Sequence, residues 1–309
     1  MKKTSDIKEQ LLLHLIILIW GFTGILGKVI ELPSTDIVWY RMLIAFLGIF
    51  IWLKVIKFDI RVSTKTLLLY LGIGLIVALH WVTFFYAIKV STVSVALATL
   101  ASATLFTSFL EPLFFKKRIV FYEVIFGFCV IAGLLMIFNF ETEYALGILV
   151  ALLSAFLASL FTVINGKLVN KGAKPRVMTL YEMLGGFIGI SIYYSVAGDF
   201  TILEGFPAPK DIFYLLLLGL VCTAFAFLIS IDVMRVLSPF TVSISINMEP
   251  VYSIVLALLI FGDDEKMSLG FYAGALLIMA TILINAVLKR YMKKRKERGK
   301  AASHKHQKL

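Results

Sequence analysis

Ten apolar stretches, each about as long as a helix that crosses a lipid bilayer, take up nearly all of this chain of 309 residues. A transmembrane helix needs about 20 consecutive, mainly apolar residues. Hydrophobic residues make up 60% of the sequence and charged residues only 16%, which is unlike a soluble domain. We predict an all-α membrane protein with ten transmembrane helices, at about residues 10–30, 36–56, 67–88, 92–115, 119–139, 144–166, 176–197, 211–234, 238–261 and 268–289.

The distribution of lysine and arginine supports this number of spans. With the N-terminus in the cytoplasm, 25 of the 30 Lys and Arg residues fall in cytoplasmic connections or termini, four fall in outer connections, and only Arg41 lies within a span. Basic residues accumulate on the cytoplasmic side of membrane proteins. We expect a multi-pass protein of the cytoplasmic (inner) membrane with both termini in the cytoplasm, and no cleavable signal peptide.

The outer connections carry acidic residues instead, and the densest group is Asp263, Asp264 and Glu265. Because this group has no partner cluster and no histidine, we expect a solvated loop rather than a metal or reactive site. Cys129 and Cys222 fall in different apolar spans, so we expect neither a disulfide nor a cysteine metal site, and no cofactor.

A short segment occurs twice in the chain. Residues 40–49 read YRMLIAFLGI and residues 181–190 read YEMLGGFIGI, identical at six of ten positions. Five spans separate the copies, so they are inverted relative to each other in the membrane. We predict two inverted five-helix repeats over residues 1–142 and 143–290, followed by a basic cytoplasmic tail over 291–309. Inverted repeats are typical of secondary transporters, whose substrate site lies near the bilayer midplane between the halves.

Depth in the membrane selects candidates for that site. At about 1.5 Å per residue, the centres of four spans fall near Trp20, His80, Ser102 and Glu249. A carboxylate at the bilayer centre costs at least about 2.5 kcal/mol, so Glu249 is expected to face a wet cavity, to couple protons or to bind a substrate ammonium. The adjacent proline leaves a purely structural role open. His80 is either a proton carrier or substrate donor in the cavity, or an interhelical hydrogen bonder.

Arg41 and Glu182 occupy equivalent positions in the two copies. Because the copies are inverted, we expect them near opposite membrane faces and not in a salt bridge. Arg41 then steers a carboxylate at the outer mouth or snorkels to headgroups, and Glu182 is an acid at the inner gate. The full set of predicted substrate-binding residues is Trp20, Tyr40, Arg41, His80, Trp81, Ser102, Glu182, Asn247, Glu249 and Tyr252.

Two segments resemble a known family. Residues 18–46, LIWGFTGILGKVIELPSTDIVWYRMLIAF, contain a Trp-Gly pair at Trp20, then Lys28 and Arg41, and residues 248–262, MEPVYSIVLALLIFG, contain a Glu-Pro pair at Glu249. Both are similar to EamA-type members of the drug/metabolite transporter superfamily. The resemblance implies export of small metabolites, often amino acids or related polar solutes, with the fifth and tenth helices peripheral to a cavity lined by the others. The basic run at 116–118 and the acidic run at 263–265 depart from the Gly-Glu pairs that the family often has there.

Other functions fit the sequence less well. An importer, or a flippase for a lipid-linked solute, has the same architecture and stays open as an alternative. A membrane enzyme is remote because no reactive constellation is present, an ATP-driven pump lacks its phosphate loop, and a channel lacks a filter motif. The net charge of +11 lies mostly in the tail from Lys289 to Lys300, which fixes topology or contacts anionic lipids; nucleic acid is not an expected partner. The oligomeric state is left open.

Overall fold

A computed structural model describes residues 2–116, 121–198, 202, 207–233, 245 and 248–306 of the chain. The described residues form helices and no strands. The elements are α1 (Lys2–Val29), α2 (Ser34–Val55), α3 (Thr64–Lys89), α4 (Val93–Leu100), α5 (Ala103–Phe115), α6 (Phe121–Phe140), the 3₁₀ turn η1 (Thr142–Tyr144), α7 (Ala145–Asn170), α8 (Pro175–Ala197), α10 (Pro209–Leu216), the π-helix η2 (Leu217–Phe225), α11 (Ala226–Val233), α13 (Glu249–Phe261), the 3₁₀ turn η3 (Gly262–Glu265) and α14 (Leu269–His306).

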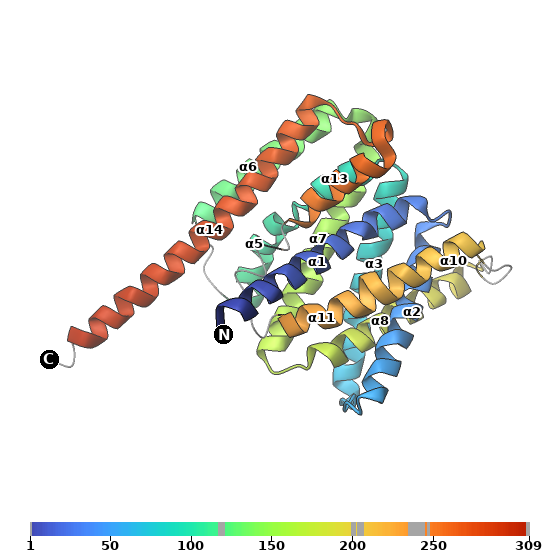
Figure 1. Ribbon diagram of the computed structural model, residues 1–309, viewed down its shortest axis with the longest axis horizontal. Coiled ribbons are helices and arrows are strands. Elements are labelled where there is room, and N and C mark those ends of the chain that lie inside the picture. Colours follow the sequence, from blue (N-terminus) through green and yellow to red (C-terminus); the bar gives the residue numbers. More distant parts are fainter. Residues whose placement is uncertain are drawn as a thin grey trace.

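The helices account for the ten predicted spans. Among the described residues, seven helical segments are long and apolar enough to cross a membrane. The other three predicted spans correspond to α6, α13 and α14. The start of α1 and the end of α14 lie at the same end of the molecule (Figure 1), as an even number of spans requires. The helix α14 continues through His306, so the described part of the predicted basic tail is helical.

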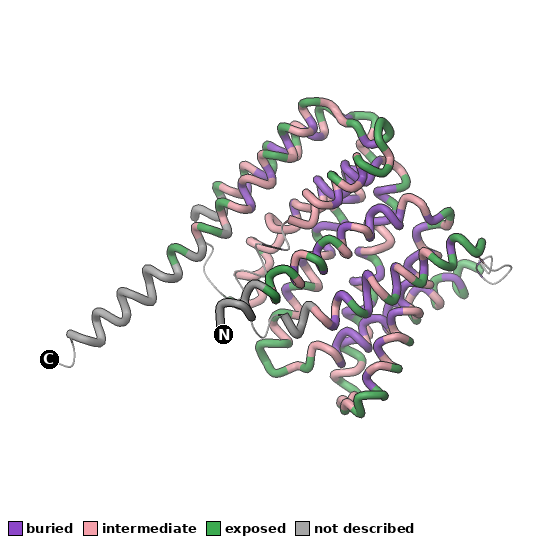
Figure 2. The backbone as a smooth tube through the Cα atoms, viewed as in Figure 1, coloured by how far each residue is buried: buried purple, intermediate pink, exposed green. Residues whose placement is uncertain are grey.

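The two repeats are inverted. Helices α6 and α14 are the fifth and tenth spans and therefore equivalent, and they pack together (Figure 1). Gly133 lies against Ile278, and Phe140 lies against Gly270, so the two helices run antiparallel. Each presents one buried stripe to the other while its remaining faces are more exposed (Figure 2). Equivalent helices that run in opposite directions are the signature of inverted repeats.

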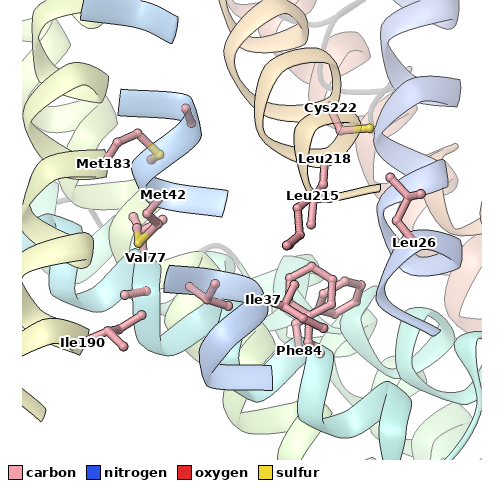
Figure 3. Close-up of a cluster of buried hydrophobic side chains, with 14 of the residues drawn as sticks. Leu26, Ile37, Met42, Val77, Phe84, Met183, Ile190, Leu215, Leu218 and Cys222 are labelled. Atoms are coloured by element: carbon pink, nitrogen blue, oxygen red, sulfur yellow. The ribbon is translucent and has the colours of Figure 1, made fainter. Parts of the chain in front are cut away.

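Glycines bring α3 and α8 together at the centre of the bundle. A Cβ atom on Gly74 would overlap the carbonyl oxygen of Glu182, and one on Gly185 would overlap the carbonyl oxygen of Leu71. Small residues allow membrane helices to approach to backbone contact. The glycines of the second YxML copy are thus explained by packing. Met42 of α2 and Met183 of α8 belong to the hydrophobic cluster beside this contact (Figure 3).

The connections sort into two groups, as the charge pattern predicts. At one end, connections predicted to be outside are joined through contacts between Lys28 and Glu265 (2.9 Å), Lys210 and Glu31 (3.1 Å), and the amide of Ser268 and Glu141 (2.9 Å). At the other end, connections predicted to be inside are joined through contacts between Lys174 and Asp59 (3.6 Å) and between the Tyr181 hydroxyl and the Ile60 carbonyl (3.0 Å).

Glu265 does not behave as the solvated loop residue that the sequence predicts. Asp263 and Asp264 are exposed, but the Glu265 side chain is completely buried. Its carboxylate accepts hydrogen bonds from the backbone amides of Val93 (3.0 Å) and Ser94 (2.9 Å), the first residues of α4. These amides have no partner within the helix. The second repeat therefore caps a helix of the first, and Lys28 balances the buried charge.

Candidate substrate-binding site

A cavity of about 250 Å³ lies between the two repeats. Its wall is formed by residues of α1, α2, α3, α4, α7, α8, η2, α11 and α13. No described residue of α6 or α14 lines it, in agreement with the peripheral position that the resemblance implies for the fifth and tenth helices. The first repeat supplies Trp20, Thr23, Arg41, Val77, His80, Trp81, Phe84 and Leu100. The second supplies Phe161, Asn165, Thr179, Glu182, Met183, Cys222, Thr223, Phe227 and Glu249.

Arg41 is the fixed positive charge of the cavity. Its side chain is only 4% exposed, its Nε donates a hydrogen bond to Thr223 Oγ1 (2.8 Å), and its guanidinium lies 3.7 Å from the centroid of the Trp81 ring. Such stacking orients a cation without neutralising it. The Nη1 atom is buried and has no partner. Arg41 therefore faces the cavity and does not snorkel to the membrane surface.

Thr223 holds Arg41 in place from a distorted helix. It lies in the π-helix η2, where its hydroxyl donates to the carbonyl of Leu218, five residues earlier (2.8 Å). Short π-helical segments occur frequently at functional sites. Hydropathy carries no signal for this distortion, so Thr223 is not among the predicted site residues. The polar wall residues Thr23, Thr179 and Cys222 are likewise absent from the predicted set.

Two acids of the second repeat line the same cavity as Arg41. Glu182 on α8 is 3% exposed, lies beside Asn165, and has an Oε1 atom without a hydrogen-bond partner. Glu249 is the first residue of α13, where the helix dipole favours a negative charge. Glu249 and Arg41 interact electrostatically, but no hydrogen bond or ion pair joins these two described side chains.

The cavity brings Arg41 and Glu182 to one site. From inversion alone, the two residues are expected at opposite membrane faces, each serving a separate mouth. In the structure both line the same cavity. The difference arises because equivalent helices cross close to the centre, so residues above and below the midplane reach a shared space. No ion pair joins these two described side chains.

His80 makes interhelical hydrogen bonds and also lines the cavity. Its Nδ1 lies 3.0 Å from the backbone carbonyl of Ser154 and 2.8 Å from that residue's hydroxyl, which in turn donates to the His80 carbonyl (2.9 Å). A carbonyl oxygen only accepts hydrogen bonds, so Nδ1 carries the N–H. In the neutral ring Nε2 is then the acceptor, and it is the nitrogen that the described hydrogen bonds leave available to the cavity.

Three predicted residues lie away from the cavity wall. The Tyr40 ring packs edge-on against Trp39, with centroids 4.9 Å apart. The Tyr252 hydroxyl is 2.9 Å from His14 Nδ1, in the interface between α13 and α1. Ser102 is fully buried between α4 and α5. Asn247, the remaining predicted residue, lies outside the described residues.

Ser102 and Glu249 occupy equivalent places in the repeats. Ser102 precedes α5 and Glu249 begins α13, and the two positions are 147 residues apart, the same offset that relates Ser91 to Ser238 in the sequence. Among the described residues, no three His, Cys, Asp or Glu side chains are placed to hold a metal ion.

Comparisons with known proteins agree with this architecture. The EamA-like transporter family matches residues 7–139 and 145–287, once for each repeat. No curated protein matches the sequence significantly. One solved structure, titled "Crystal structure of protein", has a TM-score of 0.63 over 92% of this chain and 99% of its own; at 16% identity this likeness shows the fold alone. The chain belongs to the EamA-like transporter family and is a multi-pass membrane transporter of small solutes.

Proposed function

We propose that this protein exports small zwitterionic solutes of the amino-acid class, with apolar side chains, across the cytoplasmic membrane. The observation that carries the proposal is the arrangement of the buried Arg41, the buried Glu182 and the partly buried Glu249 around a single cavity. Arg41 retains an Nη1 atom without a partner, and Glu182 retains an Oε1 atom without one. A zwitterion supplies a carboxylate to the first and an ammonium to the acids.

The energetics favour such a ligand. A buried charge without its partner is strongly destabilising, because desolvation is no longer offset. Arg41 pairs with no described acid, and stacking on Trp81 does not neutralise it. A carboxylate in contact with the guanidinium forms a charge-assisted, bidentate hydrogen bond. Loss of one partner of such a pair costs about 2–5 kcal/mol, equivalent to at least a 30-fold change in affinity.

The rest of the wall fits an apolar side chain. Trp20, Phe84, Phe161 and Phe227 line the cavity together with Leu100. Apolar walls with a few placed polar groups are typical of small-molecule sites. The volume of about 250 Å³ favours one small molecule over a lipid-linked solute.

We assign Glu249 to the substrate ammonium or to a coupling proton. Its place at the N-terminus of α13 and its interaction with the Arg41 charge support both roles. Replacing Glu249 by Gln separates them from a structural role. Transport that keeps its rate and its pH dependence in the Glu249→Gln variant would exclude both.

The two halves support transport by alternating access. The cavity draws its walls from both repeats, so tilting one repeat against the other would open it to either side. The export direction rests on the family resemblance and is part of the proposal.

Counterflow in proteoliposomes tests the proposal. Purified protein is reconstituted with unlabelled amino acids inside, and entry of a labelled apolar amino acid is followed. We expect trans-stimulated entry that is competed by zwitterions and not by the corresponding methyl esters. Flux without trans-stimulation, or no flux for any zwitterion, would contradict it. Accumulation of the solute in a deletion strain tests the direction.

A further inference from the structure

We propose that the end of the molecule predicted to face the cytoplasm carries a binding site for a phosphate-type anion, formed where α5 and α7 end. A pocket of about 440 Å³ lies there, distinct from the substrate cavity. Its wall consists of Phe114, Phe115, Lys116, Lys167, Asn170 and Lys171. Three lysines and one asparagine therefore contribute to its wall.

The lysines of this pocket are not neutralised by the described protein. No ion pair between described residues involves Lys116, Lys167 or Lys171. The nearest acid along α5 is Glu111, which forms no ion pair with Lys167. Instead, the Lys167 ammonium lies 5.9 Å from the centroid of the Phe114 ring, beside an apolar surface that strengthens its attraction to an anion.

The equivalent lysine of the first repeat indicates what kind of group pairs with Lys167. Lys28 ends the first span as Lys167 ends the sixth, each directly after a glycine. At the opposite end of the molecule Lys28 binds the Glu265 carboxylate, which comes from the connection after α13. The equivalent connection after α5 begins with Lys116, and the sequence has no acid there before Glu123. The protein itself supplies the anion that pairs with Lys28, namely the Glu265 carboxylate. An anion that pairs with Lys167 therefore has to come from outside the protein.

The location and shape of the pocket indicate the ligand class. The pocket lies at the predicted cytoplasmic interface, where acidic lipid headgroups concentrate. Lysines bind phosphate as point charges, and the two phenylalanines provide an apolar floor. A phosphodiester headgroup and a soluble phosphate share this chemistry.

Thermal unfolding with two sources of anion tests the site. Delipidated protein in a neutral detergent is titrated with inorganic phosphate against chloride at equal ionic strength. In parallel, nanodiscs of phosphatidylcholine are compared with nanodiscs containing phosphatidylglycerol. We expect at least one source to raise the unfolding temperature by about 5 °C. A response to phosphate identifies a soluble anion, and a response restricted to phosphatidylglycerol identifies a headgroup.

Four variants make the test specific. Lys167→Gln is expected to lose the response, and Lys116→Gln serves the same purpose if the first variant does not fold. Lys65→Gln, which removes an exposed charge at the same end, should respond like the wild type. Lys116→Glu, which supplies a carboxylate, should raise the unfolding temperature without anion and abolish the response. An equal response in all variants, or no response to either source, would overturn the site.

Discussion

Cys222 and Cys129 are the chain's two cysteines, and only the first lines the cavity. Cys129 lies on the peripheral helix α6. A bound solute in the cavity should therefore slow the reaction of Cys222 with N-ethylmaleimide several-fold and leave the reaction of Cys129 unchanged. Mass spectrometry of the two peptides, with and without a mixture of amino acids, measures both rates at once. Equal rates for Cys222 in the two conditions would argue against a solute in this cavity.

His80 can be dissected by two substitutions that each preserve one ring nitrogen. Asn retains a polar group near Nδ1, which holds Ser154, whereas Gln places its amide near Nε2, which is available to the cavity. If Nε2 contacts substrate, His80→Asn should fold with near wild-type stability but lose transport at least tenfold, and His80→Gln should keep more transport. Comparable transport by both folded variants would show that Nε2 does not contact the substrate and that His80 only joins helices.

The amino-acid types at the site could be predicted better than their orientation. Trp20, Arg41, His80, Glu182 and Glu249 stand out in the sequence because charged or amphipathic residues are costly within a membrane. Tyr40 and Tyr252 had the same appearance, but their rings pack on Trp39 and His14. A helix that is apolar on all sides carries no periodic signal for the face that meets the cavity.

At the scale of helices, α3 and α8 set the width of the cavity between them. Gly74→Ala should push α8 away, because its Cβ would overlap the Glu182 carbonyl, and overpacking of this kind costs about 1–3 kcal/mol. The matched control is Gly72→Ala in the same helix, where a Cβ meets nothing within 4 Å and the change should be neutral or stabilising by up to about 1 kcal/mol. Thermal unfolding and transport of both variants test this; an unaffected Gly74→Ala would contradict the packing.

The contact of α1 with η3 and α4 offers a second pair of variants. Lys28→Met leaves the fully buried Glu265 carboxylate without its cation and should destabilise the protein by about 3 kcal/mol. Lys266→Met also removes a lysine that pairs with an acid of η3, but both partners are exposed, so the unfolding temperature should change little. Equal unfolding temperatures for the two variants would show that the buried Lys28–Glu265 pair stabilises the protein no more than the exposed Lys266–Asp263 pair.

Helix interruptions are the features of these elements that hydropathy missed. The spans near 92–115 and 211–234 were predicted as plain apolar helices. The structure divides the first between α4 and α5 and places the π-helix η2 within the second. A sliding average of hydrophobicity is unchanged when a helix loses or shifts one hydrogen bond, so such breaks leave no trace in it.

For the whole molecule, the helical architecture of two inverted repeats could be predicted from the sequence. The alternation of basic and acidic connections led to inversion of the repeats, and the antiparallel pair α6 and α14 agrees with it. The sequence does not predict that Arg41 and Glu182 line the same cavity, because this depends on how closely the central helices approach each other. The glycines that permit this approach occur in the sequence, but their partners are known only from the packed structure.

In the proposed mechanism, Arg41 and the two acids together bind a zwitterion within the cavity. The most direct test is competition in the counterflow assay, comparing an amino acid with its methyl ester in the wild type and in Arg41→Gln. We predict that the wild type discriminates against the ester at least 30-fold, since the ester offers no carboxylate to the guanidinium. In the variant, discrimination should nearly vanish while the ester competes as before. Wild-type discrimination that persists in Arg41→Gln would contradict the account.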